Sequence, residues 1–266
     1  MQRLGDTGVQ SAWDRVLKLQ TELLGPSELS WLRHHQALDH DVLEVGSGMG
    51  HYGVFLANEH KEQFFWGLEA SQAFIDKCRG FPENYKVEQC RVGDDPFPNS
   101  LRGKCKTCLI RFVLQHSPDP LKLLSSLYKV LPTGAKVFII EEDDRLFVSH
   151  GDFPAWNKAV ALWRHACGIT KTNSKMGLEL PAVVERAGFV VEDFSIELRN
   201  NVKDSKAFFE LFEAVLVMFQ ETLPSVVTNE ELLPILAALR GAPPPNFVAT
   251  YPQVLLVAAK RSGLEA

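Results

Sequence analysis

A short strand followed at once by a glycine-rich turn constrains this chain more than any other feature. Residues 41–53 read DVLEVGSGMGHYG, so an apolar run ends at Val45 and glycines follow at 46, 48, 50 and 53. Glycine lets a backbone turn sharply and approach a ligand without a clashing Cβ atom. Two patterns fit this stretch. Gly48-x-Gly50-x-x-Gly53 is a dinucleotide fingerprint, whereas Glu44-x-Gly46-x-Gly48-x-Gly50 is typical of a different cofactor site.

Strand-like and helix-like segments alternate regularly after this turn. Such an alternation predicts an α/β fold with a doubly wound, mostly parallel, seven-stranded sheet, covered by helices on both faces. In such a sheet, ligands bind beyond the carboxyl end of the first strand, where the glycine turn falls. The expected strands are 41–45, 63–69, 85–92, 107–114, 135–142, 189–198 and 251–260, and the expected helices between the first five are 51–60, 71–80 and 120–131.

We expect one domain over residues 1–266, with a core at 38–145 and 178–262. The remaining segments, 8–36, 146–177 and 203–241, are expected to form helical cap elements. Gly25 and Pro26 predict a break between two N-terminal helices, and residues 143–180 read as irregular and aromatic. The predicted helix 205–223 is apolar on more than one face, which indicates either a buried cap helix or a dimer contact.

Composition narrows the class of protein and its partners. The net charge is −5, which argues against a nucleic-acid partner. No apolar run reaches the roughly 20 residues of a membrane span. The odd number of cysteines, five, favours a reducing compartment, so we expect a cytoplasmic protein. A monomer and a homodimer both remain open.

The charge of Glu44 favours one of the two cofactor patterns. A carboxylate above the glycine turn would repel a pyrophosphate, but it suits a cationic, phosphate-free ligand. S-adenosylmethionine fits that description. The segment VLEVGSGMG resembles the first motif of the class I, Rossmann-like S-adenosylmethionine-dependent methyltransferases, and the resemblance extends over about residues 41–145.

This resemblance implies a set of cofactor contacts. An acid at the end of the second strand would bind the ribose hydroxyls, and an aspartate after the third strand would accept the adenine amino group. The first residues after the fourth strand would line the sulfonium side. The corresponding cofactor-binding residues are Glu44, Gly46, Ser47, Gly48, Gly50, Glu69, Ala70, Gly93, Asp94, Asp95, Arg111 and Phe112.

The segment RFVLQHSPDP, residues 111–120, is similar to the motif of small-molecule methyltransferases of the ubiquinone/menaquinone-biosynthesis type. Methyl transfer needs alignment of the reacting atoms, and a general base only when the acceptor arrives protonated. His116 is the candidate base, or else it only shapes the pocket. Aromatic cap residues suit a flat or apolar acceptor. The acceptor candidates are Trp13, Phe147, Trp156, Trp163 and His165.

The expected reaction therefore moves a methyl group from S-adenosylmethionine to a small-molecule acceptor and yields S-adenosylhomocysteine. Two departures from the family pattern keep alternatives open: the fourth strand begins CKTC where an aspartate is usual, and the loop after the third strand is short. The alternatives are an NAD(P)-dependent oxidoreductase and a catalytically inactive, methyltransferase-like partner subunit.

No metal site is expected. Cys105 and Cys108 form a single C-x-x-C without a second pair at zinc spacing. The acidic run 141–144 has no partner acid after the fourth strand, so we expect a solvated rim or a contact for a cationic acceptor.

Overall fold

The apolar strand before the glycine turn lies at the centre of a mixed sheet. The computed structural model describes residues 7–261, so the predicted limits 1, 262 and 266 lie outside the described residues. Within them, eight strands pair in the order β3-β2-β1-β4-β5-β8-β6, and β7 pairs with β8. The strands are β1 (Val42–Val45), β2 (Phe65–Glu69), β3 (Tyr85–Gln89), β4 (Thr107–Arg111), β5 (Lys136–Glu141), β6 (Ser149–His150), β7 (Val190–Asn200) and β8 (Val248–Ala259).

The strand directions confirm the predicted fold class. Strands β1 to β5 are parallel, whereas β8 runs antiparallel to β5 and to β7. The two-residue strand β6, which pairs with the far end of β8, is the addition to the seven expected strands.

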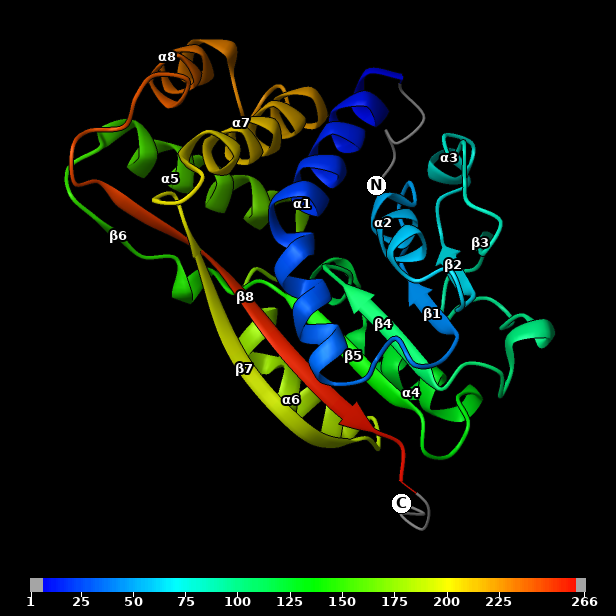
Figure 1. Cartoon of the computed structure of the whole chain (residues 1–266). Helices are drawn as coiled ribbons and strands as arrows, with labels where there is room; N and C mark the ends of the chain where they lie inside the picture. Colours follow the sequence, from blue (N-terminus) through cyan, green and yellow to red (C-terminus); the bar gives the residue numbers. More distant parts are fainter. Residues whose placement is uncertain (1–6, 262–266) are drawn as a thin grey trace.

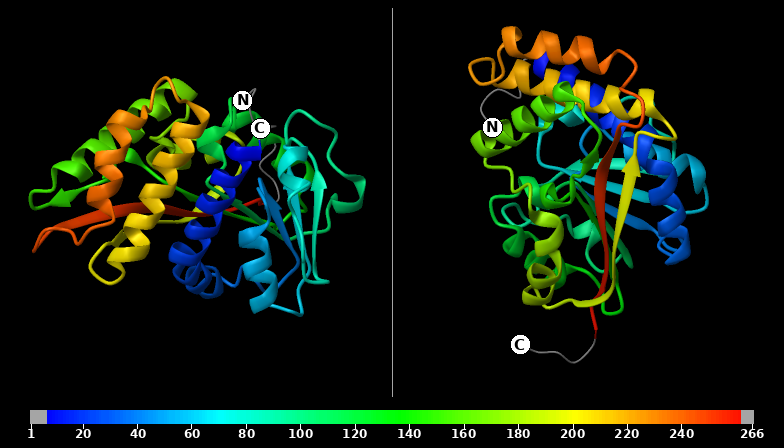
Figure 2. Two further views of the ribbon diagram at one scale, coloured as in Figure 1. Left: turned by 90° about the horizontal axis from the view of Figure 1, so that it is seen from above. Right: turned by 90° about the vertical axis from the view of Figure 1, so that its left-hand side faces the viewer.

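The sheet separates two apolar cores, because successive side chains of a strand point to opposite faces. Val42 of β1 belongs to one core and Leu43 to the other. Helices α1, α2, α5, α7 and α8 cover the first face, and α4 and α6 cover the second (Figures 1 and 2). The helices are α1 (Thr7–His34), α2 (His51–Glu59), α3 (Gln72–Ile75), α4 (Pro120–Val130), α5 (Pro154–Thr170), α6 (Met176–Arg186), α7 (Ser205–Thr222) and α8 (Asn229–Leu239).

Helix α7 is a buried cap helix. It packs between α1, α5 and α8 at one end of the molecule (Figure 1). Its phenylalanines at positions 208, 209, 212 and 219 are each less than 8% exposed. The apolar surface on several faces of this helix is therefore covered within the chain.

The prediction of two N-terminal helices was wrong, because α1 runs through Gly25 and Pro26 without a break. A proline inside a helix removes one backbone hydrogen bond and costs about 3 kcal/mol. Burial outweighs this cost: Leu24, Leu29 and Leu32 on either side of the proline are at most 5% exposed. Tertiary packing therefore overrides the local stop signal.

The prediction of an irregular segment at 143–180 was also wrong. It contains the 17-residue helix α5 and the start of α6. Pro154 occupies the first turn of α5, where a proline costs little because its missing N–H has no partner there. Trp156 and Trp163 of α5 both face the core, seven residues apart, and the aromatic residues Phe147 and Phe153 before the helix concealed this helical period.

Among the described residues, no helix is both long and apolar enough to cross a membrane.

A buried ion pair joins α1 to the centre of the sheet. Glu28 of α1 accepts hydrogen bonds from Arg111 Nε at 2.8 Å and from Gln253 Nε2 at 2.5 Å. The side chains of Glu28 and Arg111 are only 1% and 7% exposed. Arg111 also donates to the Gln20 carbonyl, and its guanidinium lies 4.3 Å from the centre of the Tyr52 ring. Three elements, α1, β4 and β8, therefore meet at one carboxylate.

We expect Glu28→Ala to lower the free energy of unfolding by about 3–5 kcal/mol, because it leaves the Arg111 charge buried and unpaired. Chemical denaturation followed by circular dichroism measures this change. The control is Glu22→Ala on the same helix, since Glu22 pairs with Lys18 at the surface and exposed pairs contribute at most about 1 kcal/mol. If both variants lowered the free energy of unfolding equally, the proposed contribution of the buried ion pair would be wrong.

Candidate functional site

The glycine turn lies where β1 ends between β2 and β4. Gly46, Gly48 and Gly50 have φ values of 72°, 59° and 83°, a region that favours glycine. The Gly46 and Ser47 N–H groups donate to the Leu68 carbonyl at the end of β2. The turn is thus held against the carboxyl edge of the sheet, at the position where open α/β sheets bind ligands.

Neighbouring side chains leave no room for larger residues at several of these glycines. A Cβ atom at Gly46 would collide with Val113, which follows β4. One at Gly53 would collide with Tyr85 and with the Glu44 carboxylate, so Gly53 serves helix–sheet packing. At Gly48 the nearest atom is Leu17 Cδ1 of α1, 3.0 Å from the Cβ position. Helix α1 therefore lies directly over the turn.

Glu44 points into the packing between β1, β3 and α2. It is 4% exposed, and one oxygen accepts a 2.8 Å hydrogen bond from the Tyr85 hydroxyl. Burial raises the pKa of Glu44 to about 7. Glu44, which distinguished the two cofactor patterns, thus has a hydrogen-bond partner within the chain. Its contact with a cofactor stays a prediction.

Glu69 ends β2 beside the turn. Its two carboxylate oxygens each accept one backbone hydrogen bond of 2.8 Å, from Gly48 and from Ser71. A carboxylate can accept about four hydrogen bonds, so both oxygens retain capacity for the hydroxyls of a diol. Burial raises the pKa of Glu69. Glu69 and Ala70 lie next to the turn, as the resemblance implies.

Gly93, Asp94 and Asp95 occupy the loop after β3. Gly93 has a φ of 98°. Asp94 pairs with Lys122 Nζ at 2.6 Å, and both side chains are about half exposed. Asp95 accepts a bond from the Arg91 N–H. Asp94 therefore lies at the surface, with an exposed partner that a ligand can replace at little cost.

The backbone turns sharply where β4 ends. Phe112 has a φ of 54°, a strained value for a residue with a side chain, and strain of this kind is often found at functional sites. Glu141 of β5 holds the next two residues, because one of its oxygens accepts the N–H groups of Val113 and Leu114 at 2.9 and 2.6 Å. Sequence reasoning missed this role of Glu141, since nothing in the order of residues shows that β5 reaches the turn after β4. Arg111 itself points to Glu28, and its cofactor contact stays a prediction.

His116 lies at an exposed position near the N-terminal part of α1. Its ring is 6.2 Å from the Trp13 ring, which is also 6.2 Å from Phe74. His116 Nδ1 lies 3.4 Å from the Thr172 hydroxyl. Desolvation by the protein atoms around the ring lowers the pKa of His116 below its usual value near 6.5. The imidazole is therefore neutral at pH 7. Phe74 and Thr172 were not identified from the sequence.

The other acceptor candidates differ in accessibility. Trp156 and Trp163 are 3% and 5% exposed and pack in the core of the cap. Phe147 is half-buried, and its ring contacts Trp163 and Tyr251 at 5.1 and 5.4 Å. His165 lies farther out, in a groove of about 610 Å³ between α5 and α8. Phe147 is thus the partly accessible member of an aromatic row that continues through Tyr251 to Phe112.

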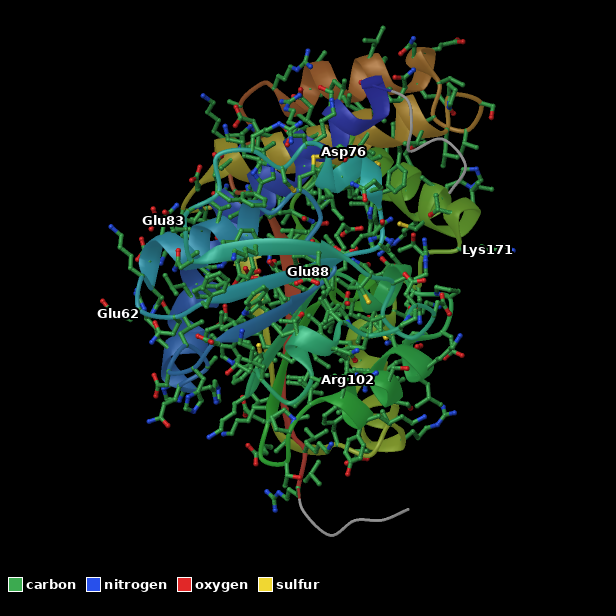
Figure 3. All side chains as sticks on the ribbon, turned by 90° about the vertical axis from the view of Figure 1, so that its right-hand side faces the viewer. Glu62, Asp76, Glu83, Glu88, Arg102 and Lys171 are labelled. Carbon is green, nitrogen blue, oxygen red and sulfur yellow. The ribbon has the colours of Figure 1, made fainter. Side chains whose placement is uncertain are left out.

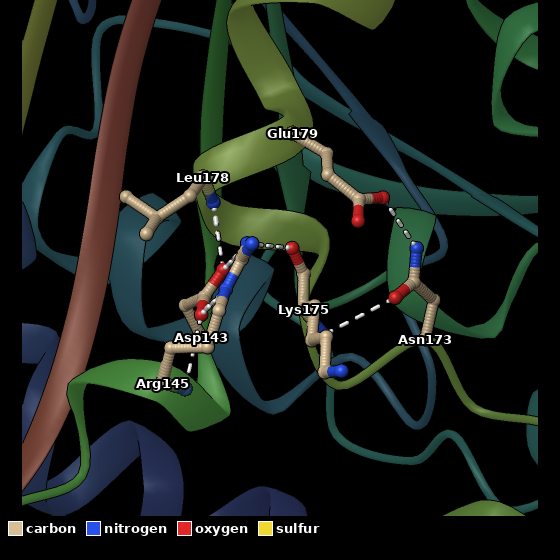
Figure 4. Close-up of polar contacts among 6 residues, drawn as sticks. All are labelled: Asp143, Arg145, Asn173, Lys175, Leu178 and Glu179. Carbon is tan, nitrogen blue, oxygen red and sulfur yellow. Dashed lines mark hydrogen bonds and ion pairs between the residues drawn. The ribbon is translucent and has the colours of Figure 1, made fainter.

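The acidic run after β5 is not a solvated rim, contrary to one of our expectations. Glu141, Glu142 and Asp143 are at most 8% exposed. Glu142 accepts a 2.7 Å bond from the Tyr251 hydroxyl, and burial raises its pKa to about 7. Asp143 accepts bonds from the Arg145 side chain and from the Leu178 N–H, which ties this turn to α6 (Figure 4). These acids organise the carboxyl edge of the sheet.

Among residues 7–261, no group of three or more histidine, cysteine, aspartate or glutamate side chains is arranged to hold a metal ion. Cys105 and Cys108 are buried thiols.

The sequence matches a known family over most of this region. The family described as "Methyltransferase domain" matches residues 14–193, which include the turn, Glu69 and His116. The chain belongs to this methyltransferase family. Members use S-adenosylmethionine, so the expected cofactor is confirmed for the family. The resemblance to the ubiquinone-type subgroup stays a prediction.

Solved structures share the fold of this methyltransferase domain. The BH2331 protein of Bacillus halodurans C-125 is 15% identical with a TM-score of 0.55, and the match covers 84% of this chain and 93% of that one. Phosphoethanolamine N-methyltransferase 2 of Haemonchus contortus, solved with S-adenosylmethionine, is 16% identical with a TM-score of 0.51. That match covers 84% of this chain and 49% of that one.

Among curated proteins, an uncharacterized 37.1 kDa protein in transposon TN4556 of Streptomyces fradiae is 28% identical over 126 residues. The match covers 47% of this chain and 36% of that relative.

The residues at the turn fit S-adenosylmethionine chemically. Glu69 offers carboxylate acceptors beside the glycines, as a ribose diol requires.

We expect the protein to become less stable as pH rises from about 4.5 to 8. Burial raises the pKa values of Glu44, Glu141 and Glu142 from 4.5 to about 7, 8 and 7, so in this window unfolding releases their protons. Each such group changes the free energy of unfolding by up to about 1.4 kcal/mol per pH unit. Thermal unfolding across this range measures the slope.

Glu141→Gln should flatten that slope and raise stability at pH 8, because the amide does not ionise. The control, Glu62→Gln, changes an exposed residue (Figure 3) and should leave the slope as it is. A Glu141→Gln protein with the wild-type slope would contradict this assignment.

Proposed function

We propose that this protein transfers a methyl group from S-adenosylmethionine to a small-molecule acceptor. The observation that carries the proposal is the bond between the Gly48 N–H and Glu69, which places a diol-binding carboxylate against the glycine turn. Membership of the methyltransferase family supports the same reading. Bound S-adenosylmethionine supplies a methyl group that its sulfonium activates for in-line displacement.

The residues of the chain have distinct roles in this proposal. The turn from Gly46 to Gly50 and Glu69 bind and orient the cofactor. Asp94 accepts the adenine amino group and gives up its surface partner Lys122. Phe112, held in its strained conformation, lines the sulfonium side. Trp13 and Leu17 on α1 exclude water, which strengthens polar interactions beneath them.

His116 is proposed to accept a proton from the acceptor. Its neutral ring lies near Trp13 and Thr172, in the short turn that follows β4. Phe147 is proposed as an acceptor contact, since its half-buried ring continues the aromatic row from Phe112. A base of this kind serves a phenol, alcohol or protonated amine. The panel of phenols, amines and thiols described below would identify the methylated atom.

Two other functions remain distinguishable by experiment. An NAD(P)-dependent oxidoreductase would use the same glycines, and a thermal shift with NAD but not with S-adenosylmethionine would favour it. An inactive partner subunit would give no labelled product with any acceptor. We also propose a cytoplasmic location, which the five free cysteines support.

We expect Gly48→Val to abolish S-adenosylmethionine binding. Valine disfavours a φ of 59°, and its Cβ would press against Leu17, so the turn and its bond to Glu69 would shift. Isothermal titration calorimetry measures the affinity. The control is Gly103→Val, since Gly103 has a similar φ of 67° but open space around it. Wild-type affinity in Gly48→Val would refute the assignment of the turn.

We expect His116→Ala to retain S-adenosylmethionine binding and to lower turnover by about 10²–10⁴-fold, the usual contribution of a general base. Product formation from labelled S-adenosylmethionine over a panel of phenols, amines and thiols measures turnover. If turnover does not change, His116 only shapes the pocket.

A further inference from the structure

Strand β7 leaves one side of the sheet open. In the described chain it pairs only with β8, although it is 11 residues long (Figure 2). The N–H and C=O groups on its outer edge therefore have no strand partner. Long free edges of this kind can pair with another chain, and proteins usually protect them with charged residues.

The three exposed side chains in the middle of β7 are apolar, whereas those near its ends, Glu192 and Asn200, are polar. Phe194, Ile196 and Leu198 are 37%, 42% and 49% exposed. The alternating residues Ser195, Glu197 and Arg199 are the half-buried ones. A strand with one face in solvent normally shows the opposite pattern. The apolar face of β7 therefore lacks cover in the single chain.

The opposite edge of the same sheet is protected. Strand β3 is only five residues long, and its exposed side chains, Lys86 and Gln89, are polar. A short edge strand with polar exposed side chains discourages pairing with another chain. The two edges therefore differ in length and in the polarity of their exposed side chains, because β7 is longer and exposes an apolar row at its centre.

We propose that β7 pairs antiparallel with β7 of a second copy of this chain, about a twofold axis at Ile196. Ile196 then lies opposite Ile196 of the second copy, and Phe194 lies opposite Leu198 of the second copy. Opposite residues of an antiparallel pair point to the same face, so the apolar side chains of the two copies cover one another. The two sheets become one continuous sheet.

Charge complementarity selects this register. It places Asp193 opposite Arg199 of the second copy, and the twofold axis repeats the pair. Arg199 Nε is buried and has no hydrogen-bond partner among the described residues. Within residues 7–261, Asp193 has one ion-pair contact, with His35 Nε2 at 3.3 Å. The second copy thus supplies a carboxylate beside a guanidinium whose Nε has no acceptor in the described chain.

Neighbouring registers lose this complementarity. An axis at Ser195 places Asp193 opposite Glu197, and like charges directly opposite are unfavourable. An axis at Glu197 places Asp193 opposite Asn201 and leaves Arg199 opposite Ser195. The self-complementary sequence of β7 therefore points to a second copy rather than to an unrelated strand.

Sedimentation velocity of the full chain tests this proposal. The wild type should sediment as a dimer, at twice 29.8 kDa. Ile196→Lys places two like charges on the twofold axis and should give a monomer with unchanged circular dichroism. The control is Leu233→Lys, because Leu233 is 61% exposed on α8 and should leave the dimer intact. A monomeric wild type, or a dimer that persists in Ile196→Lys, would overturn the proposal.

Charge exchange tests the register. Arg199→Asp should weaken the dimer, because each new aspartate faces Asp193 of the other copy. The double variant Asp193→Arg with Arg199→Asp should restore it, since both pairs form again with reversed sign. If the dimer forms but the double variant does not recover it, the register is wrong. In that case, an oxidised Ile196→Cys protein should also fail to form a disulfide-linked dimer.

Discussion

The contact between Glu28, Arg111 and Gln253 fixes the arrangement on which the site depends. It joins α1 to β4 and β8 through one buried carboxylate. Burying two charges has a large desolvation cost, which is offset only by good geometry and further hydrogen bonds. Here the Gln20 carbonyl and the Tyr52 ring complete the environment of Arg111. Because this contact sets the position of α1 along the sheet, it also sets which α1 residues reach the glycine turn.

The turn itself is held from three sides. Backbone bonds to Leu68 connect it to β2, the close approach of Val113 connects it to the segment after β4, and Leu17 covers it from α1. Glu141 in turn holds the N–H groups of Val113 and Leu114. The methyl-transfer region proposed above is therefore built from main-chain geometry, and charged side chains beneath it maintain that geometry. This division suits a reaction in which alignment matters more than acid–base chemistry.

Local sequence was enough to predict the parts of the fold that local rules determine. The alternation of strands and helices, the turn after β1 and the position of Glu69 followed from apolar runs and glycine spacing. The continuity of α1 through Pro26 did not, because it depends on the burial of Leu24, Leu29 and Leu32 against distant elements. The partners of Glu44, Arg111 and Glu142 were also inaccessible to such reasoning, since each lies on an element remote in sequence. A charged residue beside a motif suggests a ligand, but its partner can equally be another part of the chain.

The coverage of the turn by α1 has a practical consequence for the beginning of the chain. Trp13, Asp14 and Leu17 contact His116, His51 and the turn at Gly48. A ligand that enters or leaves the turn must therefore displace or pass the first half of α1. Truncation or fusion near the N-terminus would consequently change how a ligand reaches the turn, although the glycine motif itself begins only at Gly46.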